Sequence, residues 1–304
     1  MATTIMDEIR ESFKKGNALT KLIYINLGVF LVVKIVYVFF FLSVSQQTIP
    51  YGFTKESYFT NEILSYLMIP SNLSTLTLRP WTPFTYMFLH FGIIHILFNL
   101  LVLFWFGRIF LRYLTEKQLM TTYILGGLCG AILFVASYNI LPGLSDGIAL
   151  GASAAVMAIA IAISFYTPDY QVYIPFIGPT KLKYIAIFYI VLDILQIASA
   201  NAGGHIAHLG GAIYGYMFAT QLHRGKDTGK SFSKMLDSII TVFKRKPKLK
   251  VTYKSQAQNL TDEEYNMSKA KTQKEIDRIL DKIAKSGYDA LTKKEKETLF
   301  KMSK

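Results

Sequence analysis

Cysteine is almost absent from this 304-residue sequence: Cys129 is the only one, so no disulfide can form within the chain. Three other signatures are missing. The sequence has no His-Glu-x-x-His segment, no pair of cysteines and no phosphate-binding glycine loop between a strand and a helix. It therefore supports neither a metalloprotease nor a nucleotide-binding protein, and no metal ion or organic cofactor is expected.

Charged residues are also scarce, and they are unevenly placed. Only 17% of the residues are charged, against 52% that are hydrophobic. The hydrophobic residues gather in segments near the length of about 20 residues that crosses a bilayer core. The formal net charge is +13, and the excess lies mostly after Arg224, beside these segments. Anionic lipid is a simpler partner for it than nucleic acid, which we do not expect the protein to bind.

The hydrophobic segments predict an all-α membrane protein with six transmembrane helices. The expected spans are 22–44, 91–111, 120–140, 150–167, 184–200 and 206–222. The long polar and amphipathic stretch 45–89 is expected to lie in the lipid headgroup region rather than to cross the membrane. The polar start of the chain is too long for a cleaved signal peptide, so we expect the first span to be retained.

Basic residues set the expected orientation of these spans. Connections that carry lysine or arginine alternate with two connections, 138–149 and 199–204, that carry neither. By the positive-inside rule the basic connections are cytoplasmic. Both termini are then cytoplasmic, in what we expect to be a bacterial inner membrane. In this topology His95, Ser153 and His208 lie within about two turns of the outer ends of their helices.

Composition divides the chain into a cytoplasmic N-terminal segment, the six-helix region, an amphipathic and basic linker, and a small helical C-terminal module. The expected boundaries are 1–21, 22–223, 224–260 and 261–304. Apolar residues recur at helical spacing over 232–243, and the basic run 244–250 follows, which suits the inner leaflet surface. A helical pattern in the module stops at Gly287, and Thr292 and Glu295 have capping-box spacing. The sequence indicates no partner for this tail.

Polar side chains inside a membrane cost free energy unless they are paired, so those in the expected spans are candidates for function. They are His95, Asn99, Ser153, Asp193 and His208 within the spans, and His90 and His205 directly before the second and sixth spans. Taken singly, each has an ordinary explanation, because a serine among alanines can bond back to its own helix and a histidine or asparagine can join two helices. Asp193 is nearer the middle of its span, where interhelical pairing is favoured over a role as the acid of a triad.

Taken together, four of these residues supply the parts of a serine hydrolase at one depth. Ser153 needs a base to become a nucleophile, and His208 on another helix provides one. His95 and Asn99 lie on one helix face and offer hydrogen-bond donors to an oxyanion. Gly-x-x-x-Gly pairs at 126–130 and 211–215, together with small residues around the serine, let the helices approach closely.

Three segments carry these residues in chain order. They are His90-Phe91-Gly92-Ile93-Ile94-His95-Ile96-Leu97-Phe98-Asn99, Gly151-Ala152-Ser153 and Ala207-His208-Leu209-Gly210-Gly211. Together they resemble the rhomboid intramembrane serine proteases over roughly 21–222. The resemblance implies a Ser153–His208 dyad without an acidic third member, and oxyanion stabilisation by His95 and Asn99. It also implies transmembrane proteins as substrates, cleaved near the outer leaflet.

The sequence departs from that family at two positions next to the serine. The second glycine of the family pattern is Ala154 here, and the tyrosine often found four residues after the serine, packed on the histidine ring, is Met157. These departures leave the dyad intact but affect how His208 is placed. His205 is an alternative base, although the segment around His208 is the one that resembles the family.

Two other functions stay open. A catalytically silent rhomboid-like protein would bind membrane segments without cleaving them, and the two departures favour it. A transporter or channel would use the polar residues as a path, but it would need inverted repeats and interrupted helices, of which the sequence shows neither. The favoured function is that of a serine endopeptidase in the membrane.

Overall fold

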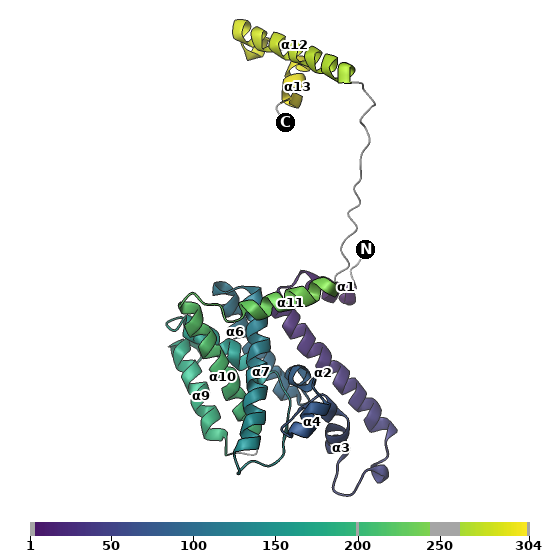
Figure 1. Cartoon of the computed structure of the whole chain (residues 1–304), viewed down its shortest axis with the longest axis vertical. Helices are drawn as coiled ribbons and strands as arrows, with labels where there is room; N and C mark the ends of the chain where they lie inside the picture. The colour runs from purple at the N-terminus through teal and green to yellow at the C-terminus, as the bar shows by residue number, and fades with distance from the viewer. Residues whose placement is uncertain (1–3, 199–200, 244–261, 303–304) are drawn as a thin grey trace. The chain divides into compact units, whose positions relative to one another are not determined.

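The structure is a computed structural model that describes residues 4–198, 201–243 and 262–302. The chain forms two compact units, Met1–Lys244 and Arg245–Lys304. Both units are mostly helical, as Figure 1 shows. The helical class expected from the hydrophobic segments is therefore correct, with the exception of two small sheets described below.

Three helices in the described part of the chain are long and apolar enough to cross a membrane. They are α2 (Ala18–Ser43), α6 (Ile93–Tyr113) and α7 (Glu116–Ile140). Three further helices complete the set: α8 (Ser153–Tyr166), which is shorter and apolar, α9 (Leu182–Gln196) and α10 (Ala202–His223). Each of the six hydrophobic segments thus contains one helix, with ends a few residues from those expected.

Helix α8 lies at the centre of the first unit. Its residues 154–164 are all buried, and it packs against α6, α7, α9 and α10. The closest approach is to α10, where a Cβ on Gly211 would overlap the carbonyl of Ala154 and one on Gly215 would overlap the carbonyl of Ala158. The glycine pair of α7 meets the side chains of the same two alanines, Ala158 opposite Gly126 and Ala154 opposite Gly130. The close packing predicted from both glycine pairs is confirmed.

The stretch 45–89 forms several short helices rather than one long one. They are η1 (Gln46–Thr48), α3 (Lys55–Glu62), η2 (Leu64–Tyr66), α4 (Leu73–Leu78), α5 (Thr82–Thr85) and η3 (Tyr86–Phe88). Side chains fix their arrangement: Trp81 Nε1 donates to the Tyr66 carbonyl at 2.8 Å, and Thr85 Oγ1 donates to the Leu67 carbonyl at 2.7 Å. These bonds hold the two ends of α5 against the end of η2.

Two antiparallel sheets correct the all-α expectation. Strand β1 (Ile69–Pro70) pairs with β2 (Ile148–Ala149), and β3 (Gln171–Ile174) pairs with β4 (Gly178–Lys181) in a hairpin. Strands of two or four residues are too short for alternation to reveal them in the sequence. The β1–β2 pair joins the stretch 45–89 to the segment that leads into α8.

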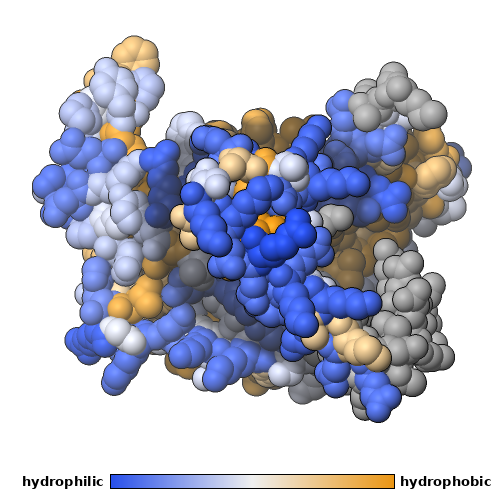
Figure 2. Space-filling model, turned by 90° about the horizontal axis from the view of Figure 1, so that it is seen from above, coloured by the Kyte–Doolittle hydropathy of each residue, from blue (hydrophilic) through white to orange (hydrophobic). Residues whose placement is uncertain are grey.

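Two further helices belong to the first unit. Helix α1 (Ile5–Lys15) begins at Thr4, which forms a capping box with Asp7. Helix α11 (Lys230–Phe243) runs across one end of α7, where Lys117 Nζ donates to Asp237 Oδ2 at 2.6 Å (Figure 1). The expected basic run 244–250 lies outside the described residues. Most of the surface visible in Figure 2 is hydrophilic.

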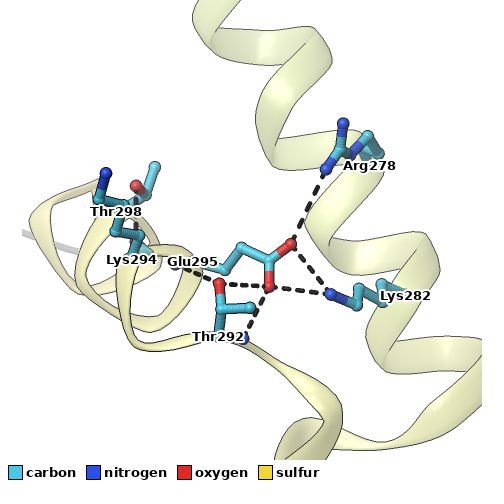
Figure 3. Close-up of polar contacts among 6 residues, drawn as sticks. All are labelled: Arg278, Lys282, Thr292, Lys294, Glu295 and Thr298. Atoms are coloured by element: carbon cyan, nitrogen blue, oxygen red, sulfur yellow. Dashed lines mark hydrogen bonds and ion pairs between the residues drawn. The ribbon is translucent and has the colours of Figure 1, made fainter.

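The second unit contains α12 (Asp262–Ser286), η4 (Tyr288–Ala290) and α13 (Lys293–Met302). Helix α12 ends before Gly287, whose φ is +77°. The predicted capping box is confirmed: the Glu295 carboxylate accepts from the backbone N–H of Thr292 at 2.7 Å and also binds Lys282 Nζ at 3.0 Å (Figure 3). These bonds fix the start of α13 against α12.

The capping carboxylate makes the start of α13 sensitive to acid. The backbone N–H of Thr292, followed by the Lys282 ammonium, lowers the pKa of Glu295 from the ordinary 4.5 to about 2. Because the folded pKa lies below the unfolded one, the stabilisation is complete above pH 4.5 and is lost as the pH falls toward 2. Hydrogen exchange corrected for intrinsic rates should show α13 opening over this range.

The Glu295→Gln substitution should reduce the protection of α13 amides at pH 6 and remove most of its acid dependence. Glu297 is exposed on the same helix, so Glu297→Gln is the matched control and should exchange like the wild type. Equal protection in both variants would show that the carboxylate does not hold the helix.

Candidate functional site

Ser153 is the first residue of α8, at a helix end that has no side-chain cap. Gly151, two residues earlier, has φ +130°, which L residues rarely adopt. The first N–H groups of a helix have no intrahelical partner and carry partial positive charge. The serine hydroxyl therefore lies beside backbone donors that can stabilise a developing negative charge.

Two anchors hold the segment before Ser153. The Gly151 N–H donates to the Tyr86 carbonyl at 2.9 Å, and the Ala152 N–H points at Nε2 of His90, 3.4 Å away. A Cβ on Gly151 would lie 2.9 Å from Cε1 of His95, so that ring packs directly on the glycine. His90 is fully buried and acts as an anchor for this backbone.

A cavity of about 550 Å³ brings the four expected site residues together. Ser153 of α8, His208 of α10, and His95 and Asn99 of α6 all line it, together with apolar side chains such as Met157. In the described part of the chain, Ser153 and His208 are not directly hydrogen-bonded. The four residues chosen from the sequence therefore share one cavity. The direct Ser153–His208 hydrogen bond that a dyad would use is absent.

Asn99 is almost buried, and its side chain is bonded to its own helix. Its Nδ2 donates to the carbonyl of His95 at 2.9 Å. An amide NH₂ has two hydrogens, so this bond leaves one of them for another acceptor. The arrangement fixes the direction of the amide while keeping a donor in the cavity.

Asp193 of α9 contacts both candidate bases of α10. Its Oδ1 lies 2.7 Å from Nδ1 of His205 and 2.9 Å from Nδ1 of His208. The carboxylate is buried, with 7% of the side chain exposed. Asp193 is thus paired between helices, as expected, and one of its two partners is the histidine that the acid of a triad would contact. That its partners are the two histidines could not be read from the sequence, because it depends on how α9 is rotated against α10.

The same three residues form the one group among the described residues that could hold a metal ion, with ligand atoms within 4.8 Å of one another. Charge argues against that use. A divalent ion beside one carboxylate would leave a net positive charge in an apolar interior, which is costly. One protonated imidazole neutralises the carboxylate completely, so hydrogen bonding accounts for the cluster better than metal binding does.

Met157 does not orient the His208 ring as an aromatic side chain would. It is buried in a cluster with Ile161 and Ala186. The ring that meets His208 is instead that of His205, edge to face, with centroids 5.8 Å apart and an interplanar angle of 82°. The imidazole of His208 is thus held by its own helix and by α9.

Comparison with known proteins identifies the first unit. Residues 77–225 match the Rhomboid domain, and residues 260–304 match a family of unknown function (DUF6576). RHOMBOID-like protein 12, mitochondrial, of Arabidopsis thaliana is 29% identical over 163 residues, which cover 49% of this chain and 48% of that protein. The human presenilin-associated rhomboid-like protein, mitochondrial, is 29% identical over 143 residues, which cover 45% of this chain and 36% of that protein.

The matched region contains α6 to α10 and every residue that lines the site on those helices. The matches cover half or less of the length of each of these two relatives. A rhomboid domain implies a multi-pass helical membrane fold, in agreement with the long apolar helices. The chain therefore contains a rhomboid domain, of the family that includes intramembrane serine proteases.

Proposed function

We propose that this protein is an intramembrane serine endopeptidase that cleaves transmembrane proteins near the outer leaflet through Ser153 and His208. The observation that carries the proposal is the shared cavity: a serine at an uncapped helix N-terminus, a histidine on the adjacent helix, and two donors on a third helix all line it. No single one of these residues would distinguish a protease from a packed membrane bundle.

The roles follow from the chemistry of each group. Ser153 Oγ attacks the substrate carbonyl carbon while His208 accepts its proton, and His208 then gives that proton to the leaving amine as the C–N bond breaks. Water next attacks the acyl-enzyme carbonyl and gives a proton to His208, which passes it to Ser153 Oγ as the ester C–O bond breaks and the carboxylic acid product leaves. The Ser153 N–H, His95 and the second Asn99 hydrogen stabilise the oxyanion. The hydrogen bond that Ser153 and His208 lack without substrate is expected to form on binding, as in many free enzymes.

The proposal includes a topology with six spans, formed by α2 and α6 to α10. Both termini and the helical tail are cytoplasmic in this topology. The basic residues support it, since Arg112 lies in the last turn of α6 and Lys117 in the first turn of α7, while the connections from α7 to α8 and from α9 to α10 carry no lysine or arginine. The division into 1–21, 22–223, 224–260 and 261–304 is part of the same proposal.

The bilayer itself is a partner in this scheme. Substrates reach the cavity laterally, and the basic linker after α10 contacts anionic lipid on the inner leaflet. The relatives named above are mitochondrial proteins, so the comparisons give no support to the bacterial inner membrane expected from the sequence.

A second candidate is a silent family member that binds membrane segments without cleaving them. The missing Ser153–His208 hydrogen bond and the two departures, Ala154 and Met157, favour it. Both candidates use the same cavity and differ only in whether the hydroxyl is activated. The reactivity of Ser153 therefore separates them.

Covalent labelling tests the proposal. A fluorophosphonate probe should label the detergent-solubilised wild type at Ser153 and leave Ser153→Ala unlabelled, because only an activated hydroxyl attacks phosphorus. Ser137→Ala, which removes a serine of α7 outside the cavity, is the matched control and should label like the wild type. Wild-type protein that binds a transmembrane peptide but neither labels nor cleaves would be the silent member.

A further inference from the structure

We propose that Asp193 is a positioning residue that fixes the orientation and tautomer of His208, and that His205 competes with His208 for the same carboxylate oxygen. The inference rests on the proposed function, in which His208 is the base. It departs from the expected dyad, which has no acidic member.

The geometry singles out this carboxylate. Both contacts go to one oxygen, at 2.7 Å from His205 and 2.9 Å from His208. The other oxygen, Oδ2, is buried and has no hydrogen-bond partner in the described part of the chain. The two imidazoles are therefore the only hydrogen-bond partners described for the carboxylate. Loss of both imidazoles would leave an unpaired buried charge and would strongly destabilise the fold.

The contact determines which nitrogen of His208 is available to Ser153. An ionised carboxylate only accepts hydrogen bonds, so Nδ1 of His208 must carry a hydrogen. In the neutral ring Nε2 is then the acceptor, on the far side of the imidazole from Asp193. His208 also lines the cavity that contains Ser153. Nε2 is therefore the nitrogen that can take the hydroxyl proton.

Charge balance explains why two histidines share one acid. Because the carboxylate carries one negative charge, the buried cluster is neutral when one of the two imidazoles carries a second ring proton. The two imidazoles therefore compete for that proton. When His208 takes the proton of Ser153, the adjacent carboxylate stabilises the imidazolium. A proton on His205 weakens that stabilisation. Removal of His205 and removal of Asp193 should therefore change the basicity of His208 in opposite directions.

Asp193 is the one acid near His208 among the described residues of the cavity and the cluster. The other titratable groups are His95 of α6 across the cavity, Tyr189 of α9 and His205 on the same helix. Helix α8 presents Ser153, and α7 packs through Cys129 against Gly210. None of these groups supplies a negative charge at neutral pH, and the thioether of Met157 and its apolar neighbours offer the imidazole no strong hydrogen bond. Asp193 is therefore the group that fixes the orientation of the His208 ring by hydrogen bonding.

Kinetics of the full-length protein in proteoliposomes test this. Asp193→Asn should lower kcat by about 100-fold with little change in KM. Because the charge that stabilises the imidazolium is gone, the acid limb of its pH–rate profile should move down by about one pH unit. His205→Leu should keep substantial turnover and move the acid limb up. His223→Gln, at the far end of α10, is the control and should match the wild type.

A purely structural role is excluded by the profile, since a loosened fold lowers the rate without moving the limb. Asp193→Asn with an unmoved acid limb, or both variants moving it in one direction, would overturn the inference. The proposed function fails separately, if Ser153→Ala still cleaves.

Nuclear magnetic resonance gives a readout that needs no activity. In micelles of ¹⁵N-histidine-labelled Ser153→Ala protein, the signal assigned through His208→Gln should show hydrogen on Nδ1. Adding Asp193→Asn should weaken that preference. Hydrogen on Nε2 in the parent protein would contradict the assignment, whether or not the protein is a protease.

Discussion

The Ser153→Ala protein is expected to lose cleavage of a reconstituted transmembrane substrate by a factor of about 10⁴ or more. The substitution removes the oxygen that would form the acyl-enzyme, and no other hydroxyl is placed at the N-terminus of α8. His208→Ala should cost about as much, because nucleophile and base act as a unit. The double variant should be no worse than either single one. Product bands from proteoliposomes over a time course measure all three.

The fold should survive Ser153→Ala, because alanine is the better helix former and the serine hydroxyl has no direct bond to His208. Equal thermal unfolding of wild type and variant checks this. Two substitutions away from the cavity, Ser137→Ala and His223→Gln, serve as matched controls and should cleave at the wild-type rate. Cleavage that persists in Ser153→Ala would refute the mechanism.

Sequence patterns predicted the helices and their contacts well where the signal is local. Apolar segments of nearly membrane-spanning length located α2 and α6 to α10, and glycine spacing located the contacts of α8 with α7 and α10. The capping box at Thr292 and Glu295 was also visible, because a cap needs only residues three apart. The β3–β4 hairpin was missed, since its turn depends on backbone conformations such as φ +68° at Phe176.

The site was predictable in part. Ser153, His208, His95 and Asn99 could be chosen from the sequence because the topology placed them at one depth and because the segments resemble one family. The bonds among them could not be predicted. Asp193 was expected nearer mid-span, yet its carboxylate reaches both histidines. Likewise, the support that His90 gives to the backbone before Ser153 is a tertiary contact with no local pattern.

Gly211→Ala should reduce both stability and activity, since α8 and α10 meet there without space for a methyl group. The added Cβ would overlap the carbonyl of Ala154, a backbone atom that cannot rotate away. We expect a loss of about 1–3 kcal/mol, measured by thermal unfolding in detergent. Gly28→Ala is the matched control, because nothing lies within 4 Å of that Cβ on α2, so its stability should be unchanged or slightly raised.

The activity loss in Gly211→Ala should exceed what the lower stability explains. Ala154 directly follows Ser153, and Gly211 lies one turn after His208, so any separation of the two backbones also separates the hydroxyl from its base. A displacement of about 1 Å can cost about 100-fold in rate. Cleavage assayed well below the unfolding temperature should therefore fall by that order, while the Gly28→Ala protein keeps the wild-type rate. Wild-type cleavage by a stable Gly211→Ala protein would show that this backbone contact does not set the distance between Ser153 and His208.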